Sequence, residues 1–262
     1  AGDLFPKTTL LASRYLYGYR SIRTSAFSTE RYVGAVCSAV SAISIKKTFA
    51  VDILSHPLYL APVPLYSKLY GGTGLVIDGC SPFIKQTFRS RAIIATERGT
   101  QSLTIPVVHD GGRTAMRDVR ISEHGNWRHQ HWNALVSAYR NSPFFEYYAD
   151  DFAHFYEERD GFLLDFNLRL NGVICNLLGI EKEIKVVDTE NGLEGFLCNA
   201  ERILDLRHIA EPKSLALLAG YKPKEYYQVF TLRNGFIPNL SIVDLLFNMG
   251  PEGLITLRES CL

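Results

Sequence analysis

Three cations lie within seven residues of one another, at Lys85, Arg89 and Arg91 in the sequence PFIKQTFRSRAII. Arginine forks bind carboxylate or phosphate through two hydrogen bonds, and a lysine adds a point charge, so the trio predicts a seat for an anionic substrate. The alternative is an exposed edge with solvated charges. Phe83 and Phe88 interleave with the cations and indicate partial burial, which a cation tolerates only with a partner.

A second group of reactive side chains lies in the run EHGNWRHQHWNALVSAY. It includes three histidines (His124, His129 and His131) and both tryptophans of the chain (Trp127 and Trp132). Imidazoles exchange protons near neutral pH, so His131 and His129 are the predicted catalytic residues, either of them as the base. Trp127 and Arg128 are predicted to contact the substrate. The alternative is that the rings anchor a helix to the core.

The spacing of these histidines does not favour a metal site. His129 and His131 are two residues apart, which on a helix points them about 200° away from each other, whereas the HExxH device needs a spacing of four. No metal ligand is therefore predicted. With His129 at a helix start, the free N–H groups of the first turn can instead face an anion.

Two further candidates have strong structural alternatives. Asp244 and Asn248 lie four residues apart on one predicted helix face and can contact a polar ligand, but short polar residues near helix ends usually satisfy the backbone. Cys80 follows an apolar run and is the best-placed thiol for a nucleophile, but free cysteines are mostly small core residues. Gly71 to Gly74 lacks the spacing of a phosphate loop.

The elements that position these residues begin with a strand, helix, strand unit. Residues 51–54 and 74–78 are short apolar runs, as expected of buried strands. Between them, residues 65–70 are compatible with a helix that stops at Gly71 and Gly72. A parallel sheet is the simplest arrangement for such a unit.

The rest of the chain predicts one hairpin and then mostly helices. The hairpin pairs 91–96 with 102–107 across a turn at 97–101, and a further strand is expected at 119–122. Apolar spacing and capping residues predict helices at 129–139, 143–157, 162–178 and 241–248. Residues 183–194 are expected to form a loop around a short strand at 184–187. The predicted class is α/β, with α+β as the alternative: a mixed sheet flanked by helices and a helical C-terminal half.

Charge, cysteine content and hydropathy limit the function classes. The chain has 262 residues, with 28 Lys and Arg against 27 Asp and Glu, so no overall field favours nucleic acid or an anionic membrane. Five widely spaced cysteines without a CxxC pair predict reduced thiols and a cytoplasmic location. The longest weakly polar run, residues 33–45, is too short to span a bilayer, which takes about 20 residues.

Residues 1–50 differ from the remainder, with seven Lys or Arg against two acids. We expect a basic N-terminal extension here, either a solvated segment or a targeting or surface-binding arm. Residues 51–262 are expected to form a single domain, with 183–194 as a weak internal boundary.

Several stretches together resemble the WbqC-like family of bacterial proteins, which is often found with surface-polysaccharide (O-antigen) genes. They are YLAPVPLYSKL, VIDGCSPFIKQTFRSRAII, LTIPV, DVRISEHGNWRHQHWNALVSAYRNSPFFEYYADDFAHFYE and YYQVFTLRNGFIPNLSIVDLLFNMGPEGL. The family usually has a double proline where this chain has Ala61 and Pro62, and an asparagine where it has Ser90. The second difference puts a polar role of position 90 in doubt.

The resemblance implies a transferase of O-antigen biosynthesis, with aminoacyl (glycine) transfer to a sugar as the reaction attached to some members. A nucleotide sugar or an activated amino acid is then the expected small-molecule substrate; cofactors and oligomeric state are left open. The alternatives are a non-catalytic sugar-phosphate-binding or scaffold protein of the same pathway and, third, a metal-dependent hydrolase.

Overall fold

The structure is a computed structural model that describes residues 51–108, 112–199 and 202–260. The predicted basic extension over residues 1–50 lies outside the described residues, and so does its boundary with the domain that follows. Within the described residues, no helix is both long and apolar enough to cross a membrane.

Four parallel strands form the main sheet of the described residues. They are β1 (Asp52–Ser55), β2 (Gly74–Asp78), β5 (Glu183–Val187) and β6 (Ile203–Asp205), in the order β5-β2-β1-β6. Every neighbouring pair is parallel. β2 is buried along its whole length, as expected of a central strand covered on both faces, which explains its unbroken apolar sequence.

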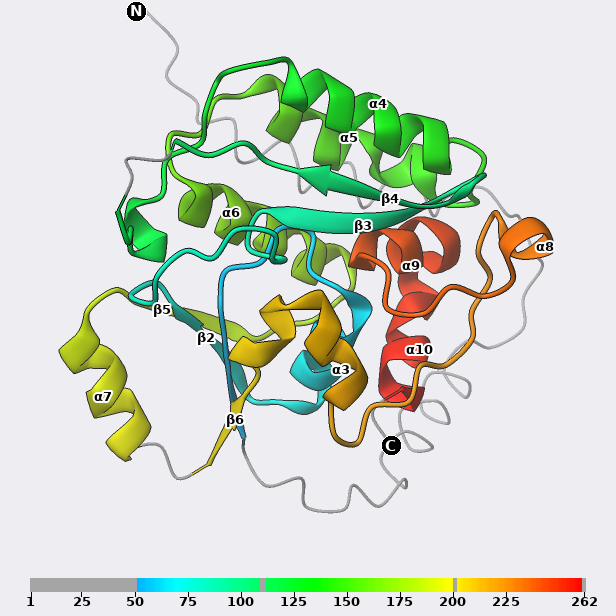
Figure 1. The fold of residues 1–262 in the computed structure, drawn as a ribbon. Helices are drawn as coiled ribbons and strands as arrows, with labels where there is room; N and C mark the ends of the chain where they lie inside the picture. The colour runs from blue at the N-terminus through cyan, green and yellow to red at the C-terminus, as the bar shows by residue number, and fades with distance from the viewer. Residues whose placement is uncertain (1–50, 109–111, 200–201, 261–262) are drawn as a thin grey trace, which may run out of the picture. The chain divides into compact units, whose positions relative to one another are not determined.

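The predicted strand, helix, strand unit is confirmed. The helix α3 (Val63–Gly71) connects β1 to β2 and begins two residues earlier than the sequence indicated, because Pro64 fits the first turn, where no N–H is needed. α3 packs against α10 (Gly253–Glu259) and α9 (Ile242–Met249), so the C-terminal helices lie beside this crossover (Figure 1).

The predicted hairpin is present, but its turn is shorter than expected. β3 (Arg91–Thr96) pairs antiparallel with β4 (Gly99–Thr104), and Thr96 lies opposite Gly99. Only Glu97 and Arg98 remain in the loop, because a two-residue turn matches the twist of the paired strands. The second strand therefore lies three residues earlier than predicted.

The helical part is built around aromatic side chains. α4 (Trp127–Tyr139), α5 (Phe145–Glu157) and α6 (Leu163–Leu177) confirm three predicted helices, and α9 confirms the fourth, with Ser241 as its N-cap. Phe247 of α9 is fully buried, and its ring packs against three other rings, those of Tyr139, Phe145 and Phe152. Helices α4, α5 and α9 are thereby joined through one cluster.

Two expectations about local structure are wrong. Residues 119–122 do not form a strand. They make two isolated bridges, Ile121 with Val107 and Arg120 with Phe162, and each of these two partner segments pairs with them at a single residue. The stretch after β5 is a helix, α7 (Glu190–Asn199), instead of a loop. Its side chains are all at least partly exposed, so it has little of the apolar periodicity that marks a helix in sequence.

Short elements complete the described chain: η2 (Met116–Asp118), η3 (Arg207–Ala210), η4 (Pro212–Leu217), α8 (Thr231–Asn234) and η5 (Gly250–Glu252). The α/β class is confirmed, with a parallel sheet, a small antiparallel sheet and a helical C-terminal half. The first part of the stretch 183–194 belongs to the main sheet, because β5 pairs with β2 along five residues.

Candidate functional site

Polar side chains gather at the edge of the main sheet where its strands end. In open parallel sheets, ligands bind outside the carboxyl ends of the strands, where the connections change direction. Counted along the chain, the four described strands have the spatial order three, two, one, four, which places this reversal between β1 and β6. His56 directly follows β1, and Arg207 lies two residues after β6, so both residues flank the reversal.

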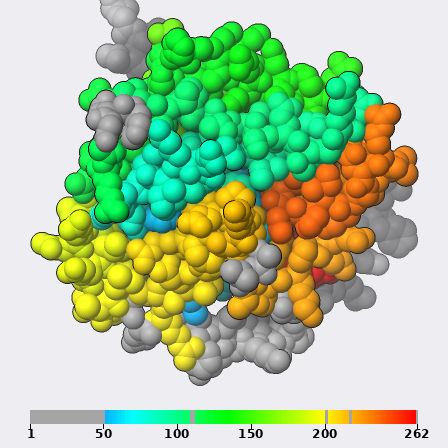
Figure 2. Space-filling model, in the orientation of Figure 1, coloured from blue at the N-terminus to red at the C-terminus, as the bar shows by residue number. Residues whose placement is uncertain are grey.

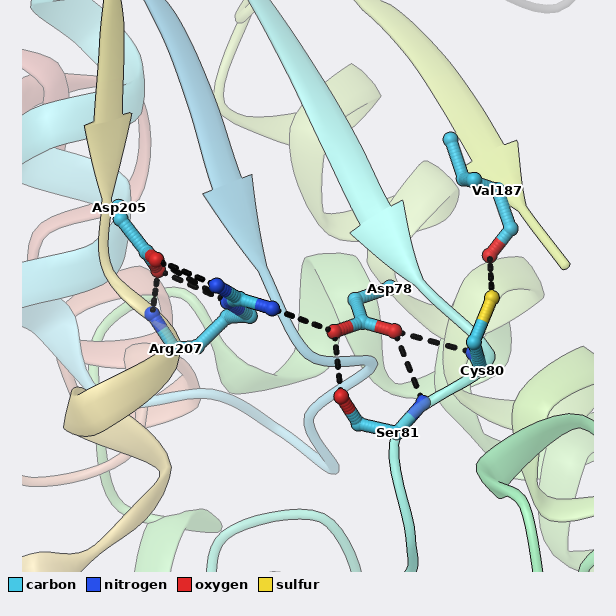
Figure 3. A network of polar contacts seen from close by, with 6 residues as sticks. All are labelled: Asp78, Cys80, Ser81, Val187, Asp205 and Arg207. Carbon is cyan, nitrogen blue, oxygen red and sulfur yellow. Dashed lines mark hydrogen bonds and ion pairs between the residues drawn. The ribbon is translucent and has the colours of Figure 1, made fainter. Parts of the chain in front are cut away.

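Asp78, the last residue of β2, is the centre of a hydrogen-bond network at this edge (Figure 3). Its Oδ1 accepts hydrogen bonds from the backbone N–H groups of Cys80 and Ser81, both at 3.0 Å. Its Oδ2 accepts from Ser81 Oγ at 2.6 Å and from Arg207 Nη1 at 3.0 Å. Burial alone raises the pKa of this carboxyl, but the hydrogen bonds from Ser81 and Arg207 outweigh burial and hold it below its ordinary value.

Arg207 joins two strand ends. Besides Asp78 it binds Asp205 of β6, donating from Nε to both carboxylate oxygens at 3.1 Å and from Nη2 to Oδ2 at 2.7 Å (Figure 3). The hydrogen bonds with Asp205 and then Asp78 raise the pKa of Arg207 above its ordinary value. The guanidinium is therefore charged and held in one orientation at the strand reversal.

His56 and Arg89 are buried beside this network, with exposed fractions of 5% and 3%. Burial and then the charge of Arg89 lower the pKa of His56 to about 4, so the imidazole is neutral near pH 7. Burial also lowers the pKa of Arg89 to about 10, while Asp78 acts in the opposite direction. Arg89 nevertheless stays charged at neutral pH.

Each of these two side chains has a nitrogen that the protein does not use. His56 hydrogen-bonds to the backbone of Asp78, and Arg89 Nη1 donates to Thr87 Oγ1 at 3.3 Å. Neither His56 Nδ1 nor Arg89 Nε has a hydrogen-bond partner within the part of the chain that the structure describes. An unpaired buried polar atom costs about 1–3 kcal/mol, so the pair marks a place where the polar atoms of a ligand fit.

Residues 82–90, which we call the covering segment, pass over the ends of β1 and β6. Phe88 N–H donates to the carbonyl of Ala210 at 2.7 Å, and Tyr59 N–H donates to the carbonyl of Phe88 at 2.8 Å. Asn167 Nδ2 of α6 donates to the carbonyl of Arg89 at 2.8 Å. These bonds fix the backbone of Arg89 close to the strand reversal.

The first crossover does not offer the usual phosphate cradle of a helix N-terminus. The connection from β1 to α3 has no glycine, and Pro64 in the first turn of α3 has no N–H to donate. The N–H of Val63 is already bonded to the carbonyl of Leu240. The start of α3 is therefore not an anion site, and Arg89 and Arg207 are two cations close to His56 at the same sheet edge.

A hollow of about 350 Å³ lies at the neighbouring strand ends and is lined by Cys80, Ala115, Arg117, Thr189, Glu190 and Asn191. Cys80 Sγ donates to the carbonyl of Val187 at 3.4 Å (Figure 3). Burial and then the charge of Asp78 raise the pKa of the thiol. A thiolate nucleophile is therefore disfavoured here, and Cys80 fits its structural alternative.

One comparison with known proteins gives a family. The model of the WbqC-like protein family matches residues 59–228, which is well over half of the chain. This chain belongs to the WbqC-like protein family. It is also 29% identical over 196 residues to the uncharacterized protein Rv1507c of Mycobacterium tuberculosis, covering 67% of this chain and 84% of that protein. No solved structure matches it.

Of the three cations predicted to bind substrate in this WbqC-like chain, Arg89 is the one beside His56. Lys85 is exposed on the covering segment. Arg91 begins β3, and its Nε donates to Thr104 Oγ1 of β4 at 3.3 Å. The three cations therefore lie in three different places: Arg89 is buried at the sheet edge, Lys85 is on the exposed surface of the covering segment, and Arg91 is in the hairpin.

His131, the predicted base, is buried among aromatic rings. Its Nδ1 lies 3.0 Å from Tyr59 Oη, which in turn lies 2.9 Å from Tyr156 Oη, and its ring stacks on that of Tyr59. Burial lowers the pKa of His131 to about 4, and a hydrogen bond to the Thr104 backbone acts the other way. These contacts fit the alternative in which His131 anchors α4 to the core, and its catalytic role stays a prediction.

His129 lies elsewhere on α4, exposed, with Nε2 2.9 Å from Asn133 Nδ2. With Trp127 and Arg128 it lines a hollow of about 320 Å³. None of Lys85, Arg89 and Arg91 lines this hollow. Arg128 stacks over the ring of Trp127 at 4.4 Å and pairs with Glu123 at 3.0 Å, so its charge is already engaged.

Asp244, another predicted substrate contact, is fully buried in α9. Its carboxylate accepts hydrogen bonds from Tyr139 Oη at 2.9 Å, Tyr226 Oη at 2.7 Å and Gln228 Nε2 at 3.0 Å. Burial raises the pKa of Asp244 to about 6, against these three donors. The contacts of Asp244 tie the tail to α4 and α9.

Sequence reasoning missed His56, Asp78 and Arg207. Two of them carried a signal, since each ends or directly follows a short apolar run, the position where a buried parallel strand presents a polar residue to a ligand. Arg207 had no such signal, because β6 has only three residues. Among the described residues, no group of three or more His, Cys, Asp or Glu side chains is placed to hold a metal ion.

Proposed function

We propose that this chain is a transferase of surface-polysaccharide (O-antigen) biosynthesis that acts on a small activated sugar bound at the sheet edge. One observation carries the proposal: two buried nitrogens without partners, His56 Nδ1 and Arg89 Nε, lie at the strand reversal of a parallel sheet. A neutral imidazole with a free lone pair can take a proton, and a guanidinium can hold an anion.

A nucleotide sugar is the substrate class that these side chains suit. The negative diphosphate of a nucleotide sugar can pair with the positive guanidinium of Arg89. Parallel sheets with this strand order also bind nucleotides at the carboxyl ends of their strands, next to the strand reversal. Lys85, exposed on the covering segment, and Arg91, on the adjoining hairpin, are the two further cations of the proposed seat. Arg207 holds the carboxylates of Asp78 and Asp205 in place and so keeps the edge rigid.

Aminoacyl transfer to a sugar is the proposed reaction. The hydroxyl or amine of the sugar gives its proton to His56 Nδ1 while its oxygen or nitrogen attacks the acyl carbon. The bond from the acyl carbon to its leaving group then breaks, and the protonated imidazole returns the proton to that leaving group. His131 and His129 are the rival bases from the sequence, and they are compared with His56 below.

Calorimetric titration with UDP-glucose tests whether Arg89 binds the diphosphate. UDP, which lacks the sugar, is titrated for comparison. We expect Arg89→Gln to weaken binding of both by about tenfold or more, because a hydrogen bond to a charged group contributes about 1.5–3 kcal/mol. Arg258→Ala, an exposed arginine of α10, is the matched control and leaves the affinity within twofold.

Thermal unfolding of Arg89→Gln shows first that the variant is folded. The exposed Lys85→Ala is a second probe, expected to weaken binding by a smaller factor without loss of stability. Binding of UDP-glucose that is unchanged in both variants rejects the seat.

A non-catalytic sugar-phosphate-binding protein is the second candidate, favoured by the closure of the site. Both unpaired nitrogens are shielded from solvent, and one of them belongs to the covering segment itself. Binding of nucleotide sugars without any turnover, across glycyl and other aminoacyl donors, supports this candidate. Turnover that depends on His56 supports the transferase.

A further inference from the structure

A second polar hollow lies outside the sheet edge, between the hairpin, α4 and the segment around α8. It measures about 1090 Å³, and we call it the arginine groove. Its walls are the hairpin turn, one face of α4 and residues 229–233, and no residue of the His56 and Arg89 cluster lines it. Figure 2 shows the surface of the hairpin next to that of the orange segment around α8. Arg233 of this segment pairs with Glu97 of the hairpin turn.

Small side chains form the floor of this open groove. Ala134, Ser137 and Ala138 of α4 leave space that larger residues would fill, and the half-buried Phe230 and Val229 face them from the tail. Asn234 Nδ2 donates to the carbonyl of Thr96 at 2.8 Å and so fixes the tail beside the hairpin. The floor is therefore apolar, and the walls on either side of it are held together.

The rim of the groove has a positive charge. Arg98, Arg140 and Arg233 line it against one acid, Glu97, which is paired with Arg233. The guanidinium groups of Arg98 and Arg140 make no hydrogen bond or ion pair with any other residue that the structure describes. Two exposed cations are thus available to an anionic ligand.

The remaining lining residues suit a hydroxyl-rich ligand. Gln101, Gln130 and Asn141 place side-chain amides around the groove, and an amide both donates and accepts, as a hydroxyl does. The ring of Phe230 offers an apolar face on which a pyranose ring can pack. A single ring is too few for nucleic acid, which stacks successive bases on several aromatics.

We propose that the arginine groove binds an acidic oligosaccharide, a short sugar chain that carries carboxylate or phosphate groups. Pockets for a single small molecule measure roughly 300–1,000 Å³, so the volume suits a ligand of several sugar rings. The amides bind its hydroxyls, Phe230 packs against one ring, and Arg98 and Arg140 pair with its anionic groups. This proposal does not depend on a nucleotide sugar or an aminoacyl donor binding at the sheet edge, so it is independent of the reaction proposed there.

Titration of the full chain with trigalacturonic acid, and with maltotriose as the neutral control, tests it. We expect the acidic trisaccharide to bind at least about tenfold more tightly, with an affinity that falls as salt rises. The double variant Arg98→Ala, Arg140→Ala is expected to lose this preference, and Phe230→Ala to weaken both sugars. Arg258→Ala, an exposed arginine outside the groove, is expected to change neither affinity.

Three results overturn the proposal. They are equal binding of the two trisaccharides, acidic binding that survives the double arginine variant, and tighter binding of an oligothymidylate of the same charge. All the groove substitutions are at exposed or half-buried positions, so thermal unfolding should show folded proteins. Because no nucleotide sugar is present, a negative result leaves the sheet-edge proposal unaffected.

Discussion

His56 and His131 are both buried imidazoles, and their hydrogen bonds separate their roles. The protein engages His131 with two partners, Tyr59 Oη at Nδ1 and the backbone of Thr104. His56 bonds to the backbone of Asp78, while its Nδ1 has no partner within the described chain. Of the two, His56 therefore has a lone pair free for the proton of a substrate, whereas the sequence had predicted His131 or His129 as the base.

Substitution of each histidine by asparagine distinguishes the two bases. We expect His56→Asn to lower turnover by about 100-fold or more, the usual contribution of a general base, while ligand affinity changes little. His131→Asn is expected to lower the stability of the fold and leave the turnover of the folded fraction within a few fold. The measurement is kcat and KM in a sugar aminoacylation assay at matched folded fractions. A folded His131→Asn protein without turnover would instead restore His131 as the base.

His131 also predicts a dependence of stability on acid. Its pKa is about 4 in the folded protein and 6.5 in the unfolded chain, so the unfolded state binds the proton more tightly. The stability that this histidine contributes is complete above pH 6.5 and is lost as the pH falls to about 4. The loss amounts to at most about 3 kcal/mol, at 1.36 kcal/mol per pKa unit.

Urea unfolding of wild type and His131→Asn between pH 7.5 and 4 measures this contribution. Groups common to both proteins, including Asp244, whose raised pKa acts with the opposite sign, cancel in the difference. The two free energies of unfolding should converge as the pH falls. Parallel curves would show that His131 does not titrate in this range.

At the scale of elements, the sequence predicted a helix or strand correctly where the residues of that element themselves carry the apolar or capping pattern typical of it. β2 is a continuous apolar run because both faces of the sheet are covered there, and Ser241 caps α9 by accepting from the N–H of Val243. β6 and α7 were missed for the opposite reason. β6 has three residues and exists through its pairing with β1, about 150 residues earlier in the chain, and α7 buries no residue.

The turn after α9 shows how a contact across elements adds to a local constraint. Gly250 has a φ of 54°, and a Cβ there would lie 2.5 Å from Cδ1 of Phe144. Gly235, after α8, has a φ of 68° and no atom within 4 Å of such a Cβ. Both positions resist a side chain on backbone grounds, and only Gly250 also has a steric obstacle.

We therefore expect Gly250→Ala to destabilise the protein more than Gly235→Ala. The positive φ costs of order 1–3 kcal/mol in each variant, and displacement of Phe144 adds about 1–3 kcal/mol in the first. Urea unfolding monitored by tryptophan fluorescence measures both changes. Equal losses of stability would mean that Phe144 moves aside without cost.

At the scale of the whole described chain, the two proposed sites differ in how a ligand reaches them. The arginine groove is lined mostly by exposed residues, whereas His56 Nδ1 and Arg89 Nε are closed off from solvent. Opening the sheet edge requires the covering segment to release the bonds from Phe88 to Ala210 and from Tyr59 to Phe88. Local openings of this kind cost less than global unfolding, because only a few contacts break.

Hydrogen exchange measured by mass spectrometry tests whether the covering segment controls entry. Without ligand, we expect amides of residues 82–90 to exchange faster than those of β2, because the segment opens locally while the central strand does not. Saturating UDP-glucose should slow exchange in residues 82–90 and 205–211 by a factor that rises with ligand concentration, since the ligand stabilises only the state that binds it. Arg89→Gln should abolish this protection. Protection by UDP-glucose around the arginine groove alone would place the nucleotide sugar there and remove it from the sheet edge.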